Sequence, residues 1–187
     1  MNRGKNVGVY KKQHGLKKLV GKVPEILILG TLPGEDSIDK KEYYSGLTNR
    51  FWEFVFATQP NVDLKKLSYR DKVKRLDEFH IALWDIYEYA ERKEGSSFDC
   101  DINLISETYK YNDIFGLLKQ NPSIKMIVFS GVSKNTRKLY AKFIEFYKDD
   151  VVAALKKGVS FIYLPSASGS NRMNREKVEK AWMKVLP

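Results

Sequence analysis

The apolar residues of this chain gather in four short runs, separated by longer segments of mixed polarity. Each run has four to six residues, is rich in Ile, Val, Leu and Phe, and lacks a regular alternation of apolar and polar positions. Such runs are typical of strands that are covered on both faces, as in parallel sheets. The predicted strands are residues 25–29, 80–83, 125–129 and 159–164.

Between and after these strands, apolar residues recur at the spacing of amphipathic helices. The predicted helices are residues 48–57, 68–79, 111–120, 133–147 and 174–186. Ser68 precedes Asp71 by three residues, a variant of the capping box, and Asn174 is a suitable N-cap. Because strands and helices alternate, the sequence predicts an α/β fold, a three-layer α/β/α sandwich with a central, mostly parallel four-stranded sheet. Residues 94–109 form the most loop-like internal segment.

Composition restricts the possible classes of protein. The 187 residues are 43% hydrophobic and 13% aromatic, enough for one substantial core. The apolar runs are too short to span a bilayer, and the first 22 residues lack the apolar stretch of a signal peptide, so we expect a soluble cytoplasmic protein. A single cysteine, Cys100, and two histidines exclude an internal disulfide, a classical zinc site and an iron–sulfur cluster. We expect no metal or other cofactor, although composition leaves a carboxylate-bound magnesium open.

The net charge of +10 is concentrated at the N-terminus. Residues 1–22 contain seven basic side chains and no acidic one, whereas the remaining 165 residues contribute only +3. We therefore expect a basic arm over residues 1–22 and a single domain over residues 23–187. Such an arm is typical of proteins that bind polyanions, and a solubilising tail is the alternative.

Two loops that follow predicted strands could bind a ligand, since ligands of parallel sheets bind at the carboxyl ends of the strands. Residues 30–37 contain two glycines and a proline, which fix a tight turn, but they match neither a Walker phosphate loop nor a dinucleotide fingerprint. Residues 165–172 are small and hydroxylated and lead into a helix. Exposed backbone N–H groups there could hold a phosphate, and an ordinary turn is the alternative.

Taken together, these loops carry a family resemblance. Ile-Leu-Ile-Leu-Gly-Thr-Leu-Pro-Gly at residues 26–34 is followed by Asn-Arg-Phe-Trp at 49–52 and Leu-Pro-Ser-Ala-Ser-Gly-Ser-Asn at 164–171. In order and spacing the chain resembles the uracil-DNA glycosylase superfamily from about residue 25 to its C-terminus, and most of all the hypoxanthine-DNA glycosylase branch. The second and third motifs also resemble the mismatch-specific uracil/thymine DNA glycosylases.

The resemblance implies a monofunctional DNA glycosylase that acts as a monomer on double-stranded DNA. Such an enzyme flips a deaminated base out of the duplex and hydrolyses its N-glycosidic bond, without a cofactor, as a step of base excision repair. Hypoxanthine is the expected base, with uracil or xanthine as alternatives. Two other classes of function stay open at this point: a non-catalytic DNA-binding module of the same fold, and a small-molecule nucleotide enzyme, which the absence of phosphate fingerprints disfavours.

The resemblance also implies roles for individual residues. Asn49 is the expected catalytic residue, and Tyr44, rather than its neighbour Tyr43, is expected to stack on the flipped base. The base-binding pocket is expected to comprise Gly30, Thr31, Leu32, Pro33, Gly34, Tyr44 and Ser130. The residues expected to contact DNA are Ser166, Ser168, Gly169, Ser170, Asn171, Arg172 and Arg175.

The chain departs from its relatives at three positions. Thr31 stands where many relatives carry an Asp or Asn that activates water, and threonine is not a strong base. Ser130 stands where the hypoxanthine branch usually has Asn, which puts the preferred base in question. Ser170 replaces an apolar wedge of the mismatch-type relatives, and Met173 is the candidate substitute.

Four further polar residues have two interpretations each. Glu35 and Asp36 could orient water or be solvated, and His80 is expected to be structural. Asp85 could line the pocket or cap a following helix.

Overall fold

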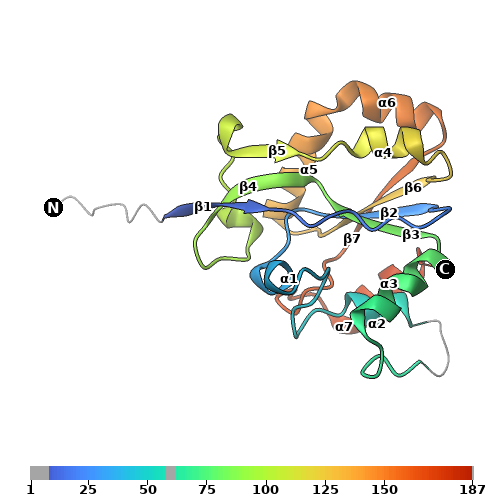
Figure 1. The fold of residues 1–187 in the computed structure, drawn as a ribbon. Helices are drawn as coiled ribbons and strands as arrows, with labels where there is room; N and C mark the ends of the chain where they lie inside the picture. Colours follow the sequence, from blue (N-terminus) through green and yellow to red (C-terminus); the bar gives the residue numbers. More distant parts are fainter. Residues whose placement is uncertain (1–8, 58–61, 187) are drawn as a thin grey trace.

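The computed structural model describes residues 9–57 and 62–186, and its centre is a parallel sheet (Figure 1). The four strands are β2 (Ile26–Gly30), β3 (Ile81–Asp85), β6 (Met126–Ser130) and β7 (Ser160–Leu164), and their order in the sheet is β3-β2-β6-β7. All neighbouring pairs are parallel. The four predicted strands are confirmed, with boundaries that differ by no more than two residues.

Helices cover both faces of this sheet (Figure 1). One layer holds α4 (Ile114–Gln120), α5 (Lys134–Phe146) and α6 (Lys148–Lys156), and the other holds α1 (Glu35–Lys40), α2 (Phe51–Val55), α3 (Tyr69–Glu78) and α7 (Arg175–Met183). Alternate residues of β2 enter different cores: Leu27 and Leu29 pack with the first layer, and Ile28 packs with the second. The predicted three-layer sandwich is therefore confirmed, and β2 is buried on both faces.

The helix starts follow their capping residues. Ser68 accepts a hydrogen bond from the Asp71 N–H at 3.2 Å, and Asn174 accepts one from the Lys177 N–H at 3.2 Å, as expected of N-caps. Two predicted helices begin later than expected, α2 at residue 51 and α4 at residue 114. In the second case Asp113 provides the cap, and Tyr111, the first residue of the predicted helix, is the last residue of a strand.

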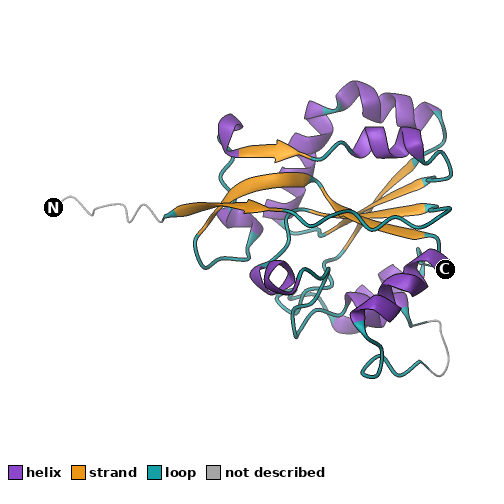
Figure 2. Cartoon of the chain, in the orientation of Figure 1, coloured by secondary structure: helices purple, strands orange, loops and turns teal. Residues whose placement is uncertain are grey.

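A second, antiparallel sheet was not predicted. It consists of β1 (Tyr10–His14), β4 (Tyr87–Lys93) and β5 (Tyr109–Tyr111) in the order β1-β4-β5 (Figure 2). The loop-like segment 94–109 connects β4 to β5 and contains two 3-10 turns, η1 (Asp99–Asp101) and η2 (Ser106–Thr108). These strands are rich in charged residues and tyrosines, so main-chain pairing rather than an apolar pattern defines them.

The expected basic arm is in part built into the domain. Residues 10–14 form β1 on β4, and Leu19 forms a bridge with Leu83 of the central sheet. Arg3 and Lys5 lie outside the described residues. The predicted boundary between arm and domain at residue 22 therefore does not apply to residues 9–22, which pack as part of the domain.

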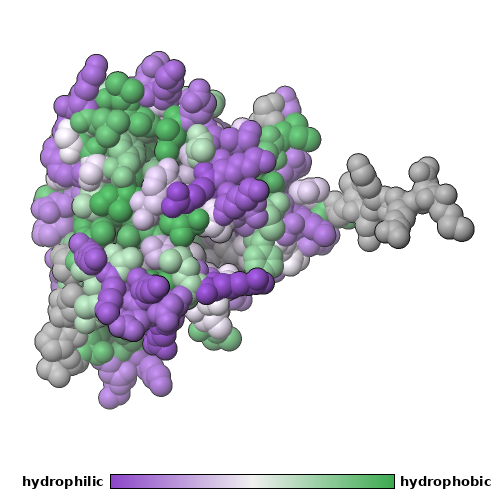
Figure 3. All heavy atoms as spheres, turned by 180° about the vertical axis from the view of Figure 1, so that it is seen from behind, coloured by the Kyte–Doolittle hydropathy of each residue, from purple (hydrophilic) through white to green (hydrophobic). Residues whose placement is uncertain are grey.

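The surface is mixed in character. Figure 3 shows hydrophilic and hydrophobic side chains interspersed on the face opposite to that of Figure 1. Exposed apolar side chains on and beside α5 and α6 include Phe146, Val152 and Leu155. Within the described part of the chain, no helix is both long enough and apolar enough to cross a membrane.

The N-terminal segment should therefore contribute to stability. Removal of residues 1–22 takes away the β1 ladder and the partly buried Leu16 and Leu19, and we expect the free energy of unfolding to fall by about 2–4 kcal/mol. Urea denaturation measures this change. A chain that begins at Val9 retains all the described contacts and is the control; equal stability of the two chains would contradict the prediction.

Candidate active site

A cavity of about 630 Å³ opens at the carboxyl ends of the four parallel strands. Gly30, Asp85 and Ser130, the last residues of β2, β3 and β6, contribute to its lining. The loops that follow β2 and β7 supply two further walls, and residues 97–100 close another side. The cavity thus lies where the topology of a parallel sheet predicts a ligand site.

The wall formed by residues 30–34 is held by a buried arginine. Arg92 of β4 is 1% exposed, and its guanidinium donates hydrogen bonds to the main-chain oxygens of Pro33 at 2.7 Å and Leu32 at 3.0 Å. Gln13 of β1 donates to the same Pro33 oxygen at 2.6 Å. Burial lowers the pKa of Arg92, and the charges of nearby acidic residues, Asp99 first, oppose this effect. The second sheet therefore fixes the first loop of the cavity.

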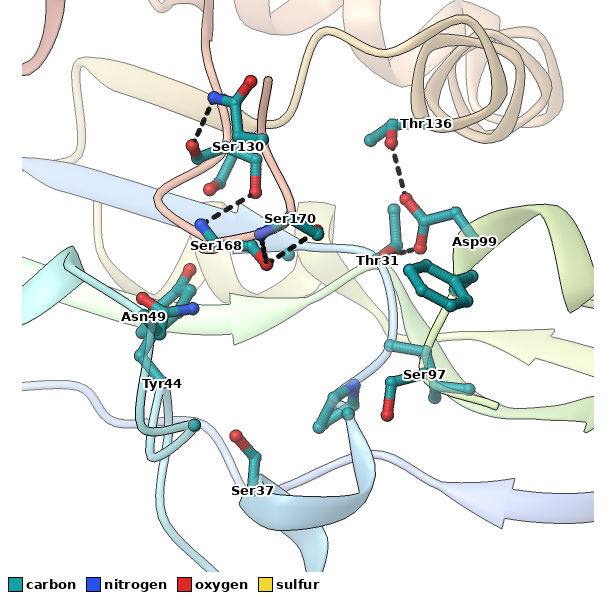
Figure 4. Close-up of a pocket in the computed structure, with 18 of the residues that line it drawn as sticks. Thr31, Ser37, Tyr44, Asn49, Ser97, Asp99, Ser130, Thr136, Ser168 and Ser170 are labelled. Atoms are coloured by element: carbon teal, nitrogen blue, oxygen red, sulfur yellow. Dashed lines mark hydrogen bonds between the residues drawn. The ribbon is translucent and has the colours of Figure 1, made fainter. Parts of the chain in front are cut away.

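Asp99 joins three parts of the cavity wall. Thr31 donates its hydroxyl to Asp99 Oδ1 at 2.6 Å, and Thr136 of α5 donates to Asp99 Oδ2 at 2.6 Å. Figure 4 shows the carboxylate between the two threonines. Because the Thr31 hydroxyl donates a hydrogen bond to Asp99, it connects the first loop to residue 99. This agrees with the expectation that Thr31 does not act as a base.

The adjacent tyrosines differ in their surroundings. Tyr43 is 4% exposed, and its hydroxyl donates to the Leu16 carbonyl oxygen at 3.3 Å. Tyr44 is half-buried and lines the cavity, and its ring stacks on Phe51 with 3.8 Å between centroids and 21° between planes. Burial raises the pKa of the Tyr44 hydroxyl, the charge of Asp85 adds to this, and a hydrogen bond with Ser130 lowers it. Tyr44 thus has one ring face covered by Phe51 and lies next to the polar floor.

Tyr44 also holds an unusual backbone conformation. Its φ angle is +56°, a left-handed value that L-residues rarely adopt. Strain of this kind is often found at functional sites, where the surrounding structure maintains it.

Asn49 lies on the same loop as Tyr44, at the side of the cavity (Figure 4). Its Oδ1 accepts a hydrogen bond from the Phe51 N–H at 2.9 Å, which supports the start of α2. A carbonyl oxygen has two lone pairs, so this bond leaves one acceptor position available. The two roles considered for Asn49, helix capping and water positioning, are therefore compatible.

Asp85 lies at the floor of the cavity. The strand β4 follows it, so the alternative role of capping a helix is wrong. The side chain is 4% exposed, and its Oδ2 has no hydrogen-bond partner among the described residues. In the parallel register Asp85 lies beside Gly30, where an added Cβ would come within 2.3 Å of Asp85 Oδ1. The missing side chain of Gly30 makes room for the carboxyl group.

Burial raises the pKa of Asp85 to about 7. The nearby Tyr43 hydroxyl and the charge of Arg92 lower the pKa, and the charge of Asp99 raises it. A carboxyl group that is half-protonated near neutral pH can act as an acid as well as a base.

The loop after β7 satisfies its own backbone. The hydroxyls of Ser166 and Ser168 accept from the N–H groups of residues 168 and 170, and Asn171 Oδ1 accepts from the Met173 N–H. The expectation that this loop presents unpaired backbone N–H groups to a phosphate is therefore wrong for these three positions. Short polar side chains accept hydrogen bonds from the nearest backbone N–H groups. The side-chain hydroxyls, rather than the backbone N–H groups, are therefore the groups that can contact a ligand.

Most of the predicted site residues line this one cavity. They are Gly30, Thr31, Leu32, Pro33, Gly34, Tyr44, Asn49, Ser130, Ser166, Ser168, Ser170 and Asn171. Gly169, Arg172 and Arg175 are exposed and are not part of the lining, and Gly169 lies against Thr48.

The remaining candidates divide between the rim and the scaffold. Met173 is 46% exposed and lines the rim, as do Glu35 and Asp36 at the start of α1. His80 is remote from the lining, and its Nδ1 is 2.8 Å from the Val23 carbonyl oxygen, which supports its expected structural role. Within residues 9–57 and 62–186, no three side chains of His, Cys, Asp or Glu are grouped so as to hold a metal ion.

Sequence reasoning missed Asp99 and Thr136. Asp99 falls in the loop-like segment, and Thr136 in the first turn of a helix, where neither position has a local pattern that points to the cavity.

Comparison with known proteins identifies the family. The hypoxanthine DNA glycosylase of Methanosarcina acetivorans is 31% identical to the chain over 176 residues, which cover 93% of this chain and 98% of that protein. The chain belongs to the hypoxanthine-DNA glycosylase branch of the uracil-DNA glycosylase superfamily. This membership confirms the resemblance carried by the sequence motifs.

Two other similarities agree with it. The hypoxanthine DNA glycosylase of Methanosarcina barkeri is 28% identical over 94% of this chain and 98% of its own length. An NMR solution structure of a candidate uracil DNA glycosylase from M. acetivorans has a TM-score of 0.71 at 30% identity, covering 94% of this chain and 96% of that one. No protein-family model matches the chain.

Replacement of Arg92 should weaken this glycosylase fold. We expect Arg92→Met to lower the free energy of unfolding by about 2–5 kcal/mol, because the buried Leu32 carbonyl loses its side-chain donor and Asp85 and Asp99 lose a nearby cation. Urea denaturation tests this. Lys93→Met, at the neighbouring exposed position of β4, is the matched control and should change stability by no more than about 0.5 kcal/mol. Similar losses in both variants would show that Arg92 does not hold the loop.

Replacement of Asp85 by Asn should stabilise the fold in a pH-dependent way. The folded-state pKa of about 7 exceeds the ordinary value of 3.8, so the contribution of Asp85 to stability is largest below about pH 4 and is lost as the pH rises through 7. Asparagine carries no such penalty. We expect the advantage of Asp85→Asn to grow by up to about 4 kcal/mol between pH 4 and pH 8.

Thermal and urea denaturation at both pH values measure this advantage. Asp39→Asn, at an exposed position of α1, controls for the loss of one negative charge. An advantage that does not grow between the two pH values would contradict the burial of a titrating carboxyl group.

Proposed function

We propose that this protein is a monofunctional DNA glycosylase that hydrolyses the N-glycosidic bond of hypoxanthine in double-stranded DNA. The observation that carries the proposal is the cavity at the strand ends, which brings together Tyr44, Asn49 and Ser130 in a chain of the hypoxanthine-DNA glycosylase branch. The reaction needs water as nucleophile and no cofactor. The protein acts as a monomer in the cytoplasm.

Base capture relies on a flipped nucleotide that enters the cavity with its base first. Tyr44 is the stacking platform for that base, because Phe51 supports one face of its ring and Tyr44 lines the cavity. Stacking of a base on an aromatic ring contributes about 1–3 kcal/mol in single-strand binders. The wall held by Arg92 confines the base on the opposite side.

Cleavage builds positive charge on the sugar while the base leaves with the bond electrons. Asn49 Oδ1 accepts from a water molecule through the lone pair that Phe51 leaves unused, and its dipole faces the developing cation. The hydrogen bond to Phe51 fixes the amide before the substrate arrives, so no reorganisation is needed during the reaction.

Contacts with the DNA backbone are electrostatic. The hydroxyls of Ser168 and Ser170 at the mouth, and the exposed Arg172 and Arg175 beyond it, are placed to meet phosphates. The excess basic charge of residues 1–22 adds affinity without sequence preference. Met173, an exposed apolar side chain at the rim, enters the gap in the stack.

A panel of duplexes that contain hypoxanthine, uracil or xanthine tests the proposal. We expect alkali-sensitive abasic sites in the hypoxanthine duplex, and strand cleavage only after alkali. Binding of all duplexes without abasic sites would instead identify a non-catalytic DNA-binding module. Preferential cleavage of uracil or xanthine would contradict the assigned base, in which case Ser130 is the first position to examine.

Replacement of Asn49 should separate its two roles. We expect Asn49→Ala to lower the single-turnover rate at least about 100-fold, equivalent to about 2.7 kcal/mol of barrier, while lesion binding is kept. The same change removes a helix-start hydrogen bond, which costs about 1 kcal/mol of stability.

Asn174→Ala is the matched control for that loss. It removes the N-cap bond of α7 from a residue that does not line the cavity. Single-turnover rates and melting curves of both variants are compared. Equal rates in the two variants would reduce Asn49 to a helix cap.

A further inference from the structure

The floor and the mouth of the cavity differ in depth. Asp85 is 4% exposed, whereas Asn49 and Ser168 at the sides are half-buried and Ser170 is exposed. A flipped nucleotide stays attached to its strand by two phosphates, so its sugar remains near the mouth while its base goes to the floor. Among these groups, Asp85 therefore faces the base and not the sugar.

Asp85 differs from Asp99, another acidic group of the cavity wall. Both Asp99 oxygens accept hydroxyl hydrogen bonds, from Thr31 and Thr136, and this carboxylate is fully engaged in structure. Asp85 Oδ2 has no partner among the described residues, although it is buried. An unpaired buried carboxyl oxygen is costly, and a ligand that supplies a partner would relieve the cost.

A purine offers the required partner. Hypoxanthine, like guanine, carries acceptors at N7 and O6. An acceptor on the ligand calls for a donor on the protein, and a carboxyl group donates only in its acid form. The low-polarity site favours that form, since burial raises the pKa of Asp85 to about 7.

We propose that the carboxylic acid of Asp85 donates a hydrogen bond to N7 of the flipped purine and transfers its proton to N7 as the glycosidic bond breaks. This role rests on the proposed function, because it requires a purine substrate. It gives the reaction a general acid at the leaving group.

The step balances as follows. The C1′–N9 bond breaks and its electron pair moves into the purine ring, while the Asp85 O–H bond breaks and its proton goes to N7. The base thus leaves as neutral hypoxanthine. Water forms a bond to C1′ of the sugar cation and gives up a proton, which returns Asp85 to its acid form through solvent.

The tyrosines and the arginine near Asp85 do not compete with it as the titrating acid. The charged or titratable side chains that act on it or respond to its charge are Tyr43, Tyr44, Arg92, Asp99 and Tyr140. Burial raises the pKa values of the three tyrosine hydroxyls, so these stay neutral, and a guanidinium keeps its proton in proteins. The Asp99 oxygens accept from two hydroxyls and face those partners.

The first test is the pH dependence of single-turnover cleavage of a hypoxanthine duplex. For the wild type we expect the rate to fall tenfold per pH unit above about pH 7, as the acid form is depleted. Asp85→Asn keeps the shape but has no transferable proton, so it should be at least 100-fold slower at pH 6 and show no such fall. A variant within threefold of the wild type, or one that retains the alkaline fall, would overturn the proposal.

The second test changes the substrate atom. In a duplex with 7-deazahypoxanthine, a C–H group replaces N7. The wild type should lose its alkaline fall on this substrate, a result that requires no variant to fold. The loss of rate caused by the deaza substitution should be at least tenfold smaller in Asp85→Asn than in the wild type, because the interaction is already absent there. If the deaza substitution lowers the rate by the same factor in the wild type and in Asp85→Asn, Asp85 does not act on N7.

Failure of this proposal can be told apart from failure of the proposed function. If the wild type cleaves hypoxanthine and Asp85→Asn does so equally well, only the role of Asp85 is overturned. If the wild type leaves hypoxanthine intact, the proposed function is overturned, and the role of Asp85 at a purine N7 with it. Thermal melting of Asp85→Asn at the assay pH confirms that the comparison is made between folded proteins.

Discussion

The carbonyl oxygens of Leu32 and Pro33 both accept hydrogen bonds from the guanidinium of Arg92, a residue that is 1% exposed. Burial of a peptide carbonyl without a donor is costly, and a tight loop at the end of a parallel strand has no neighbouring strand to supply one. The donor comes instead from β4 of the second sheet. The two sheets are therefore interdependent, because the antiparallel sheet supplies the hydrogen bonds that shape one wall of the cavity.

The same cation organises the charge of the site. Burial raises the pKa of Asp85 and the charge of Asp99 adds to this, whereas the Tyr43 hydroxyl and the charge of Arg92 lower it. Tyr43 and Arg92 together oppose the effect of burial, so the pKa of this carboxyl group stays near neutral pH. This balance places the pKa of about 7 where a small change of surroundings shifts the protonation state. A bound base would be such a change.

The central layer of the fold was predictable from sequence because burial dictates it. Strands covered on both faces must be apolar at every position, so β2 and β6 are visible as runs of Ile, Leu, Val and Phe. Short polar caps such as Ser68 mark the helix starts by a local hydrogen bond, and these were also predictable.

The second sheet was not predictable because its strands lack a run of apolar residues. Residues 10–14 carry two lysines, a glutamine and a histidine, and the partner β4 supplies the pairing through its main chain. The family motifs located Tyr44 and Asn49, whereas the Asp99 bridge depends on three segments that meet only in the folded chain. The neighbourhood of Gly30 and Asp85 depends likewise on the order of the strands, which the sequence does not specify.

The position of the acidic group has a consequence for which part of a nucleotide it can reach. The family resemblance implies an acidic or amide residue at the position of Thr31 in many relatives, on the loop, where it activates water. Here that loop position is tied to Asp99, and the available carboxyl group lies at the end of β3, beside Gly30 in the register of the sheet. A group on the loop can approach the sugar, but a group on the floor meets the base. We infer that an acid on the floor of the cavity assists the departure of the base, whereas an acid on the loop would assist the attack of water. In this protein the water is then left to the neutral amide of Asn49.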